Sequence, residues 1–111
     1  MIKYENNKIL LNDKELVFEH NIFEAAFIFG KLIIVFETDE DNGYDNVYCF
    51  NRNQDKLWRI KQVPKEIGGT VRTPYVGVDI YYEKCRVVDF FGRRFTVDIN
   101  DGHIISKDIV R

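Results

Sequence analysis

The sequence predicts an all-β protein: antiparallel strands in two blade-like four-stranded units plus an N-terminal hairpin. Residues 47–60 and residues 95–105, about 48 positions apart, each read as a strand, a polar turn and a second strand. A repeat of 40–50 residues suits a four-stranded unit. Apolar and polar residues alternate in several segments, and no segment shows a convincing helical period. We expect the two units to stack as a β-sandwich or a half-propeller.

The N-terminal part, residues 1–19, should hold a hairpin and a further strand. Asn6 and Asn7 mark the hairpin turn, since asparagine tolerates positive φ, and Asn12-Asp13 marks the next turn. The first four-stranded unit is expected over residues 20–62. Its strands are predicted at 22–29, 31–37, 47–51 and 56–62.

A connecting loop is predicted over residues 63–74, where two prolines and two glycines interrupt the pattern. The second four-stranded unit is expected over residues 75–111. Its strands are predicted at 75–80, 84–90, 94–99 and 103–110, and the last pair closes over Asn100-Asp101-Gly102.

The hydrophobic pattern differs between the two units. In the second unit apolar residues alternate with polar ones, which indicates a sheet with one solvated face. The apolar positions expected on the inner face are Val76, Val78, Ile80, Phe95, Val97 and Ile99. In the first unit, residues 27–29 and 32–36 are apolar throughout, so both faces need cover. The N-terminal hairpin and the other unit should supply most of it.

Composition indicates one domain of 111 residues with ample core material, including nine Phe and six Tyr. The longest apolar stretch, residues 25–36, contains Gly30 and Lys31 and is too short to span a membrane. The N-terminus has no secretory signal pattern, so a cytoplasmic location is expected. Cys49 and Cys85 should then be buried free thiols.

Two segments resemble the blades of quinoprotein-type β-propellers: residues 47–60, with Lys-Leu-Trp after an Asn-centred turn, and residues 95–105. Closed propellers use about four or more blades. The resemblance therefore implies an open stack, with a monomer preferred over a ring of copies. No propeller cofactor site is carried over to this chain, and no cofactor is expected.

Charge is unevenly distributed. Residues 20–51 hold six acidic residues against Lys31 alone, whereas residues 52–94 hold ten basic and five acidic residues. Most of the acids lie in one loop, which is longer than the ~2–5 residues that a hairpin connection needs. The loop residues predicted to contact a partner are Glu37, Asp39, Glu40, Asp41, Tyr44 and Asp45.

Three interpretations of this loop remain open. Its carboxylates could attract a basic protein surface. They could bind calcium, although Gly43 falls one position early for an EF-hand loop and no glutamate stands at the twelfth position. The loop could also be an ordinary solvated hairpin tip.

Catalytic patterns are absent from the sequence. His20 and His103 lie far apart without a zinc-type cluster, Ser106 has no Gly-x-Ser-x-Gly context, and no phosphate-binding loop occurs. The sequence therefore predicts a protein that is not an enzyme and has no catalytic or zinc-type metal site; calcium binding by the acidic loop stays the one open alternative.

A second surface is suggested by the turn that contains Phe91, Arg93 and Arg94, which are secondary candidates for partner contact. Aromatic and basic residues of the second unit could also stack on single-stranded nucleic acid. The net charge of −2 and the acidic loop make nucleic acid a weaker partner.

The small size, the acidic loop and the missing catalytic set resemble small bacterial immunity proteins of toxin–immunity pairs, including the contact-dependent inhibition type. That resemblance implies occlusion of a basic toxin domain, such as a nuclease, by the acidic loop. The alternatives are an oligomerising structural β module and the nucleic-acid-binding module described above.

Overall fold

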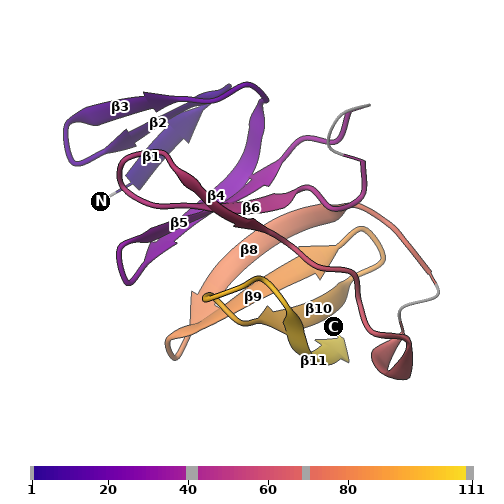
Figure 1. The fold of residues 1–111 in the computed structure, drawn as a ribbon. Helices are drawn as coiled ribbons and strands as arrows, with labels where there is room; N and C mark the ends of the chain where they lie inside the picture. Colours follow the sequence, from indigo (N-terminus) through magenta and orange to yellow (C-terminus); the bar gives the residue numbers. More distant parts are fainter. Residues whose placement is uncertain (1, 40–42, 69–70, 110–111) are drawn as a thin grey trace.

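The computed structural model describes residues 2–39, 43–68 and 71–109, which form three antiparallel sheets (Figure 1). The first sheet contains β1 (Ile2–Glu5), β2 (Lys8–Leu11) and β3 (Lys14–Val17). The second contains β4 (Ile22–Ile28), β5 (Lys31–Phe36), β6 (Val47–Phe50) and β7 (Lys56–Arg59). The third contains β8 (Tyr75–Tyr81), β9 (Lys84–Asp89), β10 (Arg93–Val97) and β11 (Ile104–Ile109). In each sheet the spatial order of the strands follows the chain. The predicted all-β architecture of four-stranded units behind an N-terminal hairpin is confirmed.

Short turns set the ends of several strands. Asn6, Asn12 and Asp13 all have positive φ, as the predicted polar turns require. The strand expected over 22–29 ends at Ile28, because Phe29 and Gly30 both adopt positive φ and form the turn to β5. The connecting segment contains one short 3-10 turn, Lys65–Ile67. Within the described ranges, no helix has the length and apolar character of a membrane-crossing helix.

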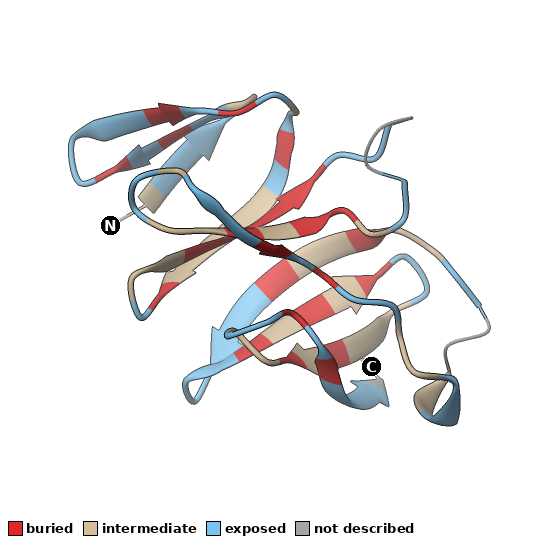
Figure 2. Ribbon diagram, viewed as in Figure 1, coloured by how far each residue is buried: buried red, intermediate tan, exposed pale blue. Residues whose placement is uncertain are grey.

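Strand β5 lies in the middle layer and is buried on both sides (Figure 2). Leu32, Ile34 and Phe36 pack against the first sheet in a core that includes Ile9 and Leu16. The alternate residues Ile33 and Val35 pack against the third sheet. The first sheet and the third sheet thus cover the two faces of β5, which confirms the expected origin of its unbroken apolar run.

The third sheet turns one face to the second sheet and the other to solvent. Cys85, Val87, Phe95 and Val97 are buried in the shared core. The outer face carries two bidentate ion pairs, Arg86 with Asp79 and Arg94 with Asp108. The prediction of one solvated face is confirmed.

One detail of that prediction is wrong. A β-bulge between Tyr75 and Gly77 shifts the alternation of β8, so Tyr75 and Val78 are buried. Val76, expected on the inner face, lies at the bulge and is only partly buried, whereas Ile80 pairs with buried Cys85 on the inner face but is 37% exposed near the end of the strand. The bulge adds a residue to one strand only and is not visible in the apolar pattern.

Trp58 of β7 joins the outer edges of the second and third sheets. Its indole Nε1 donates a hydrogen bond to the Ile99 carbonyl at 2.8 Å. Its ring lies against Gly102, where an added Cβ would be only 2.5 Å from Cε3 of Trp58. The turn before β11 therefore needs glycine at this position for space as well as for its φ of +81°.

We predict that Gly102→Ala destabilises the protein markedly more than Gly92→Ala. Both glycines have φ of +81°, but a Cβ at Gly92 meets no atom within 4 Å. The shared φ cost cancels in the comparison, and the clash with Trp58 should add about 1–3 kcal/mol to the loss. Urea unfolding of both variants measures the difference; equal losses would contradict the contact.

The two cysteines are buried free thiols, as predicted. Burial raises the pKa of Cys49 to about 11 and that of Cys85 to about 12. Thiolate is the reactive form, so both groups should be inert in the folded chain.

We predict that a thiol reagent at pH 8 labels the native protein very slowly and labels two groups per chain after unfolding. Because the unfolded thiols ionise near pH 8.5, the free energy of unfolding should fall as the pH rises from about 9 to 11. The absorbance of the released chromophore, followed with and without denaturant, measures the rate and number of thiols labelled. Rapid labelling of the native chain would show that the core between the sheets opens easily.

Candidate functional site

The predicted acidic loop leaves β5 and returns through Asn46, which is almost fully buried. The Asn46 side chain donates to the carbonyls of Phe36 and Tyr75, at 2.7 and 2.9 Å. Its side-chain oxygen accepts from the Tyr75 backbone N–H at 2.9 Å. Asn46 therefore ties the base of the loop to the first residue of the third sheet.

The C-terminal arm of the loop is held by arginines from neighbouring segments. The carboxylate of Asp45 pairs with Arg72 at 2.7 Å, and its carbonyl accepts from Arg59 Nε at 2.7 Å. Tyr44 is 51% exposed. The Arg72 guanidinium lies 6.0 Å from the centre of the Tyr44 ring. These contacts fix Asp45 and Tyr44 relative to the connecting segment.

The N-terminal arm of the loop is held from the other side. His20 Nδ1 lies 2.8 Å from the Asp39 carboxylate, and the Glu37 N–H donates to the Asn21 carbonyl. The predicted contact residues Glu40 and Asp41 lie outside the described residues. Two carboxylates of this loop, Asp39 and Asp45, thus already have a basic neighbour within the protein.

A buried carboxylate organises the next turn, between β9 and β10. Asp89 is 2% exposed and accepts from the backbone N–H groups of Phe91 and Arg93. It also pairs with Arg93 Nε at 2.7 Å. The other guanidinium nitrogens of Arg93 donate to the carbonyls of Gly68 and Val71. Arg93 therefore links the turn to the connecting segment, and its guanidinium nitrogens donate to groups of the protein itself.

The same turn exposes two phenylalanine rings. Phe90 is 67% exposed and Phe91 is 64% exposed, and their centres lie 6.0 Å apart. The Phe90 N–H donates to the Pro74 carbonyl, which anchors the turn. The sequence-based expectation of an exposed ring at Phe91 agrees with this geometry.

The fold brings three of the candidate residues, Tyr44, Asp45 and Arg93, to one end of the molecule. Residues from the loop, the connecting segment and the β9–β10 turn line a common hollow; they include Tyr44, Asp45, Val71, Arg72, Asp89 and Arg93. Figure 1 shows these three segments together at the right of the molecule. We call this surface, together with the adjoining β9–β10 turn, the loop face; Tyr44 and Val71 are exposed at the hollow, and Phe90 and Phe91 are exposed on the turn. Arg94 is not part of it, because it pairs with Asp108 on the outer face of the third sheet.

The rings proposed for nucleic-acid stacking do not form one track. Tyr75 is buried in the core, and Tyr81 and Tyr82 lie at the β8–β9 turn, at the opposite end of the strands from Phe90. Arg86 lies over Tyr81 but is paired with Asp79. The described rings are therefore divided between two ends of the sheet.

A hollow of about 390 Å³ adjoins the loop between the first and second sheets. Its walls are mainly aromatic and include Phe18, His20, Phe36, Tyr48, Phe50 and Lys56. The Lys56 and Arg59 side chains lie over the Tyr48 ring, at 5.5 and 5.2 Å from its centre. This hollow is formed by packing between two sheets, so no local sequence motif could predict it.

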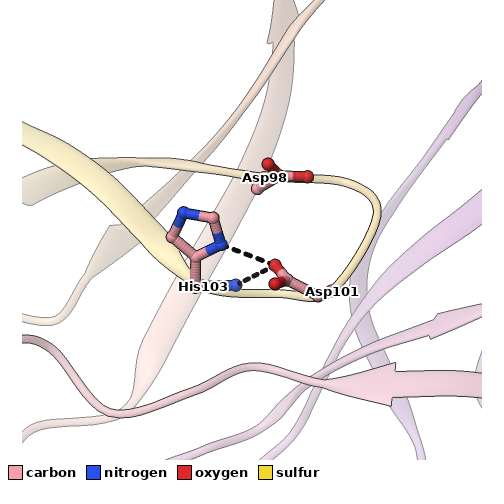
Figure 3. A group of neighbouring side chains, drawn as sticks. All are labelled: Asp98, Asp101 and His103. Atoms are coloured by element: carbon pink, nitrogen blue, oxygen red, sulfur yellow. Dashed lines mark hydrogen bonds and ion pairs between the residues drawn. The ribbon is translucent and has the colours of Figure 1, made fainter.

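One cluster of potential metal ligands occurs among the described residues: Asp98, Asp101 and His103 (Figure 3). Both the backbone N–H and the ring Nδ1 of His103 contact one oxygen of Asp101, and these hydrogen bonds lower the pKa of Asp101. Asp98 accepts from the Asn100 N–H at 2.8 Å. These are the hydrogen bonds of a side-chain-stabilised turn, as expected for the turn that closes over Asn100-Asp101-Gly102.

The structure defines a class of fold: an all-β protein of two four-stranded sheets and one three-stranded sheet that resemble the blades of a β-propeller. The crystal structure of BamB from Moraxella catarrhalis is similar to this chain, with a TM-score of 0.62 at 15% sequence identity. The match covers 100% of this chain and 32% of BamB, so the chain spans about a third of that protein. The likeness confirms the expected blade-like units and concerns the fold alone.

The chain belongs to the family described as "Domain of unknown function (DUF7957)", which matches residues 1–109. No curated protein matches the sequence.

We predict that Asn46→Ala costs about 3 kcal/mol in the free energy of unfolding. The substitution leaves buried backbone groups of Phe36 and Tyr75 without their side-chain partner. Asn53→Ala, at an exposed turn position, is the matched control and should cost less than about 0.5 kcal/mol. Denaturant unfolding checks both values; a small loss at Asn46 would mean that the loop is held by other contacts.

Proposed function

We propose that this protein is a non-enzymatic binding protein that recognises a protein partner through the loop face. The observation that carries the proposal is that the loop with exposed Tyr44 and the β9–β10 turn with exposed Phe90 and Phe91 border one hollow and are fixed by buried polar contacts. Aromatic side chains are enriched in the cores of protein interfaces. Rings held in advance lose little conformational freedom when a partner covers them.

The buried contacts supply this pre-organisation. Asn46 holds the loop that carries Tyr44, and Asp89 holds the turn that carries both phenylalanines. Arg93 ties that turn to the connecting segment through two carbonyls. The aromatic side chains are thus presented by irregular backbone that is supported from within.

The charges favour a basic partner. Glu37, Asp39, Glu40, Asp41 and Asp45 lie in the loop beside Tyr44. Pairing of Asp45 with Arg72 reduces the net negative charge of the face, so we assign most of the affinity to the rings and a steering role to the acids.

In its specific form, the proposal is that the partner is a basic bacterial toxin domain, such as a nuclease. The loop face would cover the active surface of the toxin and neutralise it in the cytoplasm. The small immunity proteins that the sequence resembles act by such occlusion. A neighbouring reading frame that encodes a long protein with a basic C-terminal domain would support this form, and that domain is the probe for the test below.

We predict that Tyr44→Ala and Phe91→Ala each weaken binding of this basic domain about 30-fold, the effect of removing a strong interface residue. Tyr82→Ala is the matched control, because Tyr82 is 81% exposed but lies at the opposite end of the third sheet. Neither substitution at the loop face should change the unfolding midpoint much, since these side chains are exposed. Isothermal titration calorimetry measures the affinities.

Replacing Glu37, Asp39, Glu40 and Asp41 together by Ser should lower the association rate and flatten its dependence on salt. The control is Glu15→Ser with Glu83→Ser, which removes exposed acids at other sites. Unchanged affinity in both aromatic variants would place the binding surface elsewhere. Toxin activity that persists in the saturated complex would contradict occlusion.

A further inference from the structure

The first sheet lacks a strand that the other two sheets possess. The first strands of the second and third sheets, β4 and β8, lie side by side. The Glu24 carboxylate of β4 accepts from the Val78 N–H of β8 at 3.0 Å. The first sheet has only three strands, and its edge strand β1 contacts β4.

The direction of β1 identifies which strand is missing. The end of β1 lies at the beginning of β4, because the Ile22 N–H donates to the Asn6 carbonyl at 2.7 Å. Strand β1 therefore runs opposite to β4, as its arrow shows in Figure 1. In the complete sheets, only the second and fourth strands run opposite to the first strand. Strands β1 to β3 thus correspond to the second, third and fourth strands of a four-stranded sheet. The strand without a counterpart is the first one, which in the other two sheets is β4 or β8.

The vacant position leaves β1 exposed along most of its length (Figure 2). Tyr4 is paired directly with Ile9, so it faces the same side of the sheet. Ile9 is fully buried, yet Tyr4 is 41% exposed. Hollows flank the strand on both faces; one includes Lys3, Tyr4 and Glu5, and the other includes Ile2 and Phe27.

The backbone groups of β1 offer a defined set of hydrogen bonds at this edge. Outward-pointing groups alternate along an antiparallel strand. Because the Asn6 carbonyl points outward to Ile22, the N–H and C=O groups of Tyr4 and Ile2 also point to the free edge. An added strand would pair with β1 through these groups.

We propose that a second copy of this protein supplies the added strand, with β1 pairing antiparallel to β1 of the partner copy about a two-fold axis. The axis passes beside Tyr4, so each Tyr4 exchanges both backbone hydrogen bonds with the other Tyr4. The two first sheets then form one continuous six-stranded sheet.

The charges on β1 select this occupant and this register. With Tyr4 opposite Tyr4, Lys3 of each copy stands opposite Glu5 of the other at a pair without hydrogen bonds, where side chains approach most closely. A shift by one pair in either direction would place Lys3 opposite Lys3 or Glu5 opposite Glu5. Neither side chain has an ion-pair partner within the described part of the chain. The Lys-Tyr-Glu sequence is therefore self-complementary.

This inference departs from the monomer that the sequence favours. The apolar run of β5, which could have required a second copy for cover, is covered by the first and third sheets of the same chain. The free edge of β1 is a separate feature, and no strand of the described residues pairs with it.

Sedimentation velocity over a range of protein concentrations tests the proposal. The wild type should form dimers as the concentration rises. Lys3→Glu and Glu5→Lys should each raise the dimer dissociation constant about tenfold, because two attractive pairs become repulsive in the symmetric interface. The double variant K3E/E5K restores opposite charges and should return the constant to within about threefold of the wild type.

Lys84→Glu, at the exposed start of β9, is the control for a general effect of charge and should leave the dimer unchanged. Circular dichroism confirms that each variant is folded. A wild type that remains monomeric at every concentration would overturn the proposal. So would a double variant that dimerises no better than the two single variants.

Discussion

Burial of strand β5 on both faces is the constraint on which the three layers depend. Leu32 and Ile34 face the first sheet, and Ile33 and Val35 face the third. Because β5 is apolar at every position from Leu32 to Phe36, it has no polar alternation to fix its register, and a slip by one residue would still bury apolar side chains. Its register must come from its ends, where the Phe29-Gly30 turn and the Asn46 hydrogen bonds to neighbouring backbone are found.

Buried polar groups have a corresponding role at the loop face. Asn46 and Asp89 are the two buried polar residues of the described core, and each organises a connection between strands. Each satisfies backbone groups that would otherwise be costly to bury. Apolar packing therefore holds the sheets together, whereas these two side chains determine the shape of the irregular segments between them.

The sequence predicted the features that local patterns encode. Alternation at Phe95 and Val97 identified an inner face, Asn6 and Asn12 identified turns, and the unbroken run in β5 indicated cover on both sides. The hydrogen bonds of Asn46 and Arg93 that hold the irregular segments could not be predicted from the sequence. Asn46 bonds to Tyr75, 29 residues away, and Arg93 bonds to Gly68, 25 residues away. The acidic loop was recognised as a group of charges, but the side chains that contact its carboxylates, His20 and Arg72, come from other segments. Long-range pairing of this kind leaves no periodic signal in a single sequence.

The charged outer surface of the third sheet has a consequence for the evolution of this architecture. Stacked repeats stay soluble when the last one presents a hydrophilic exterior, as the capping units of solenoid proteins do. Here Asp79 with Arg86 and Asp108 with Arg94 form that exterior. A further layer packed on this face would bury four charged groups, so adding one would require replacement of these residues by apolar ones.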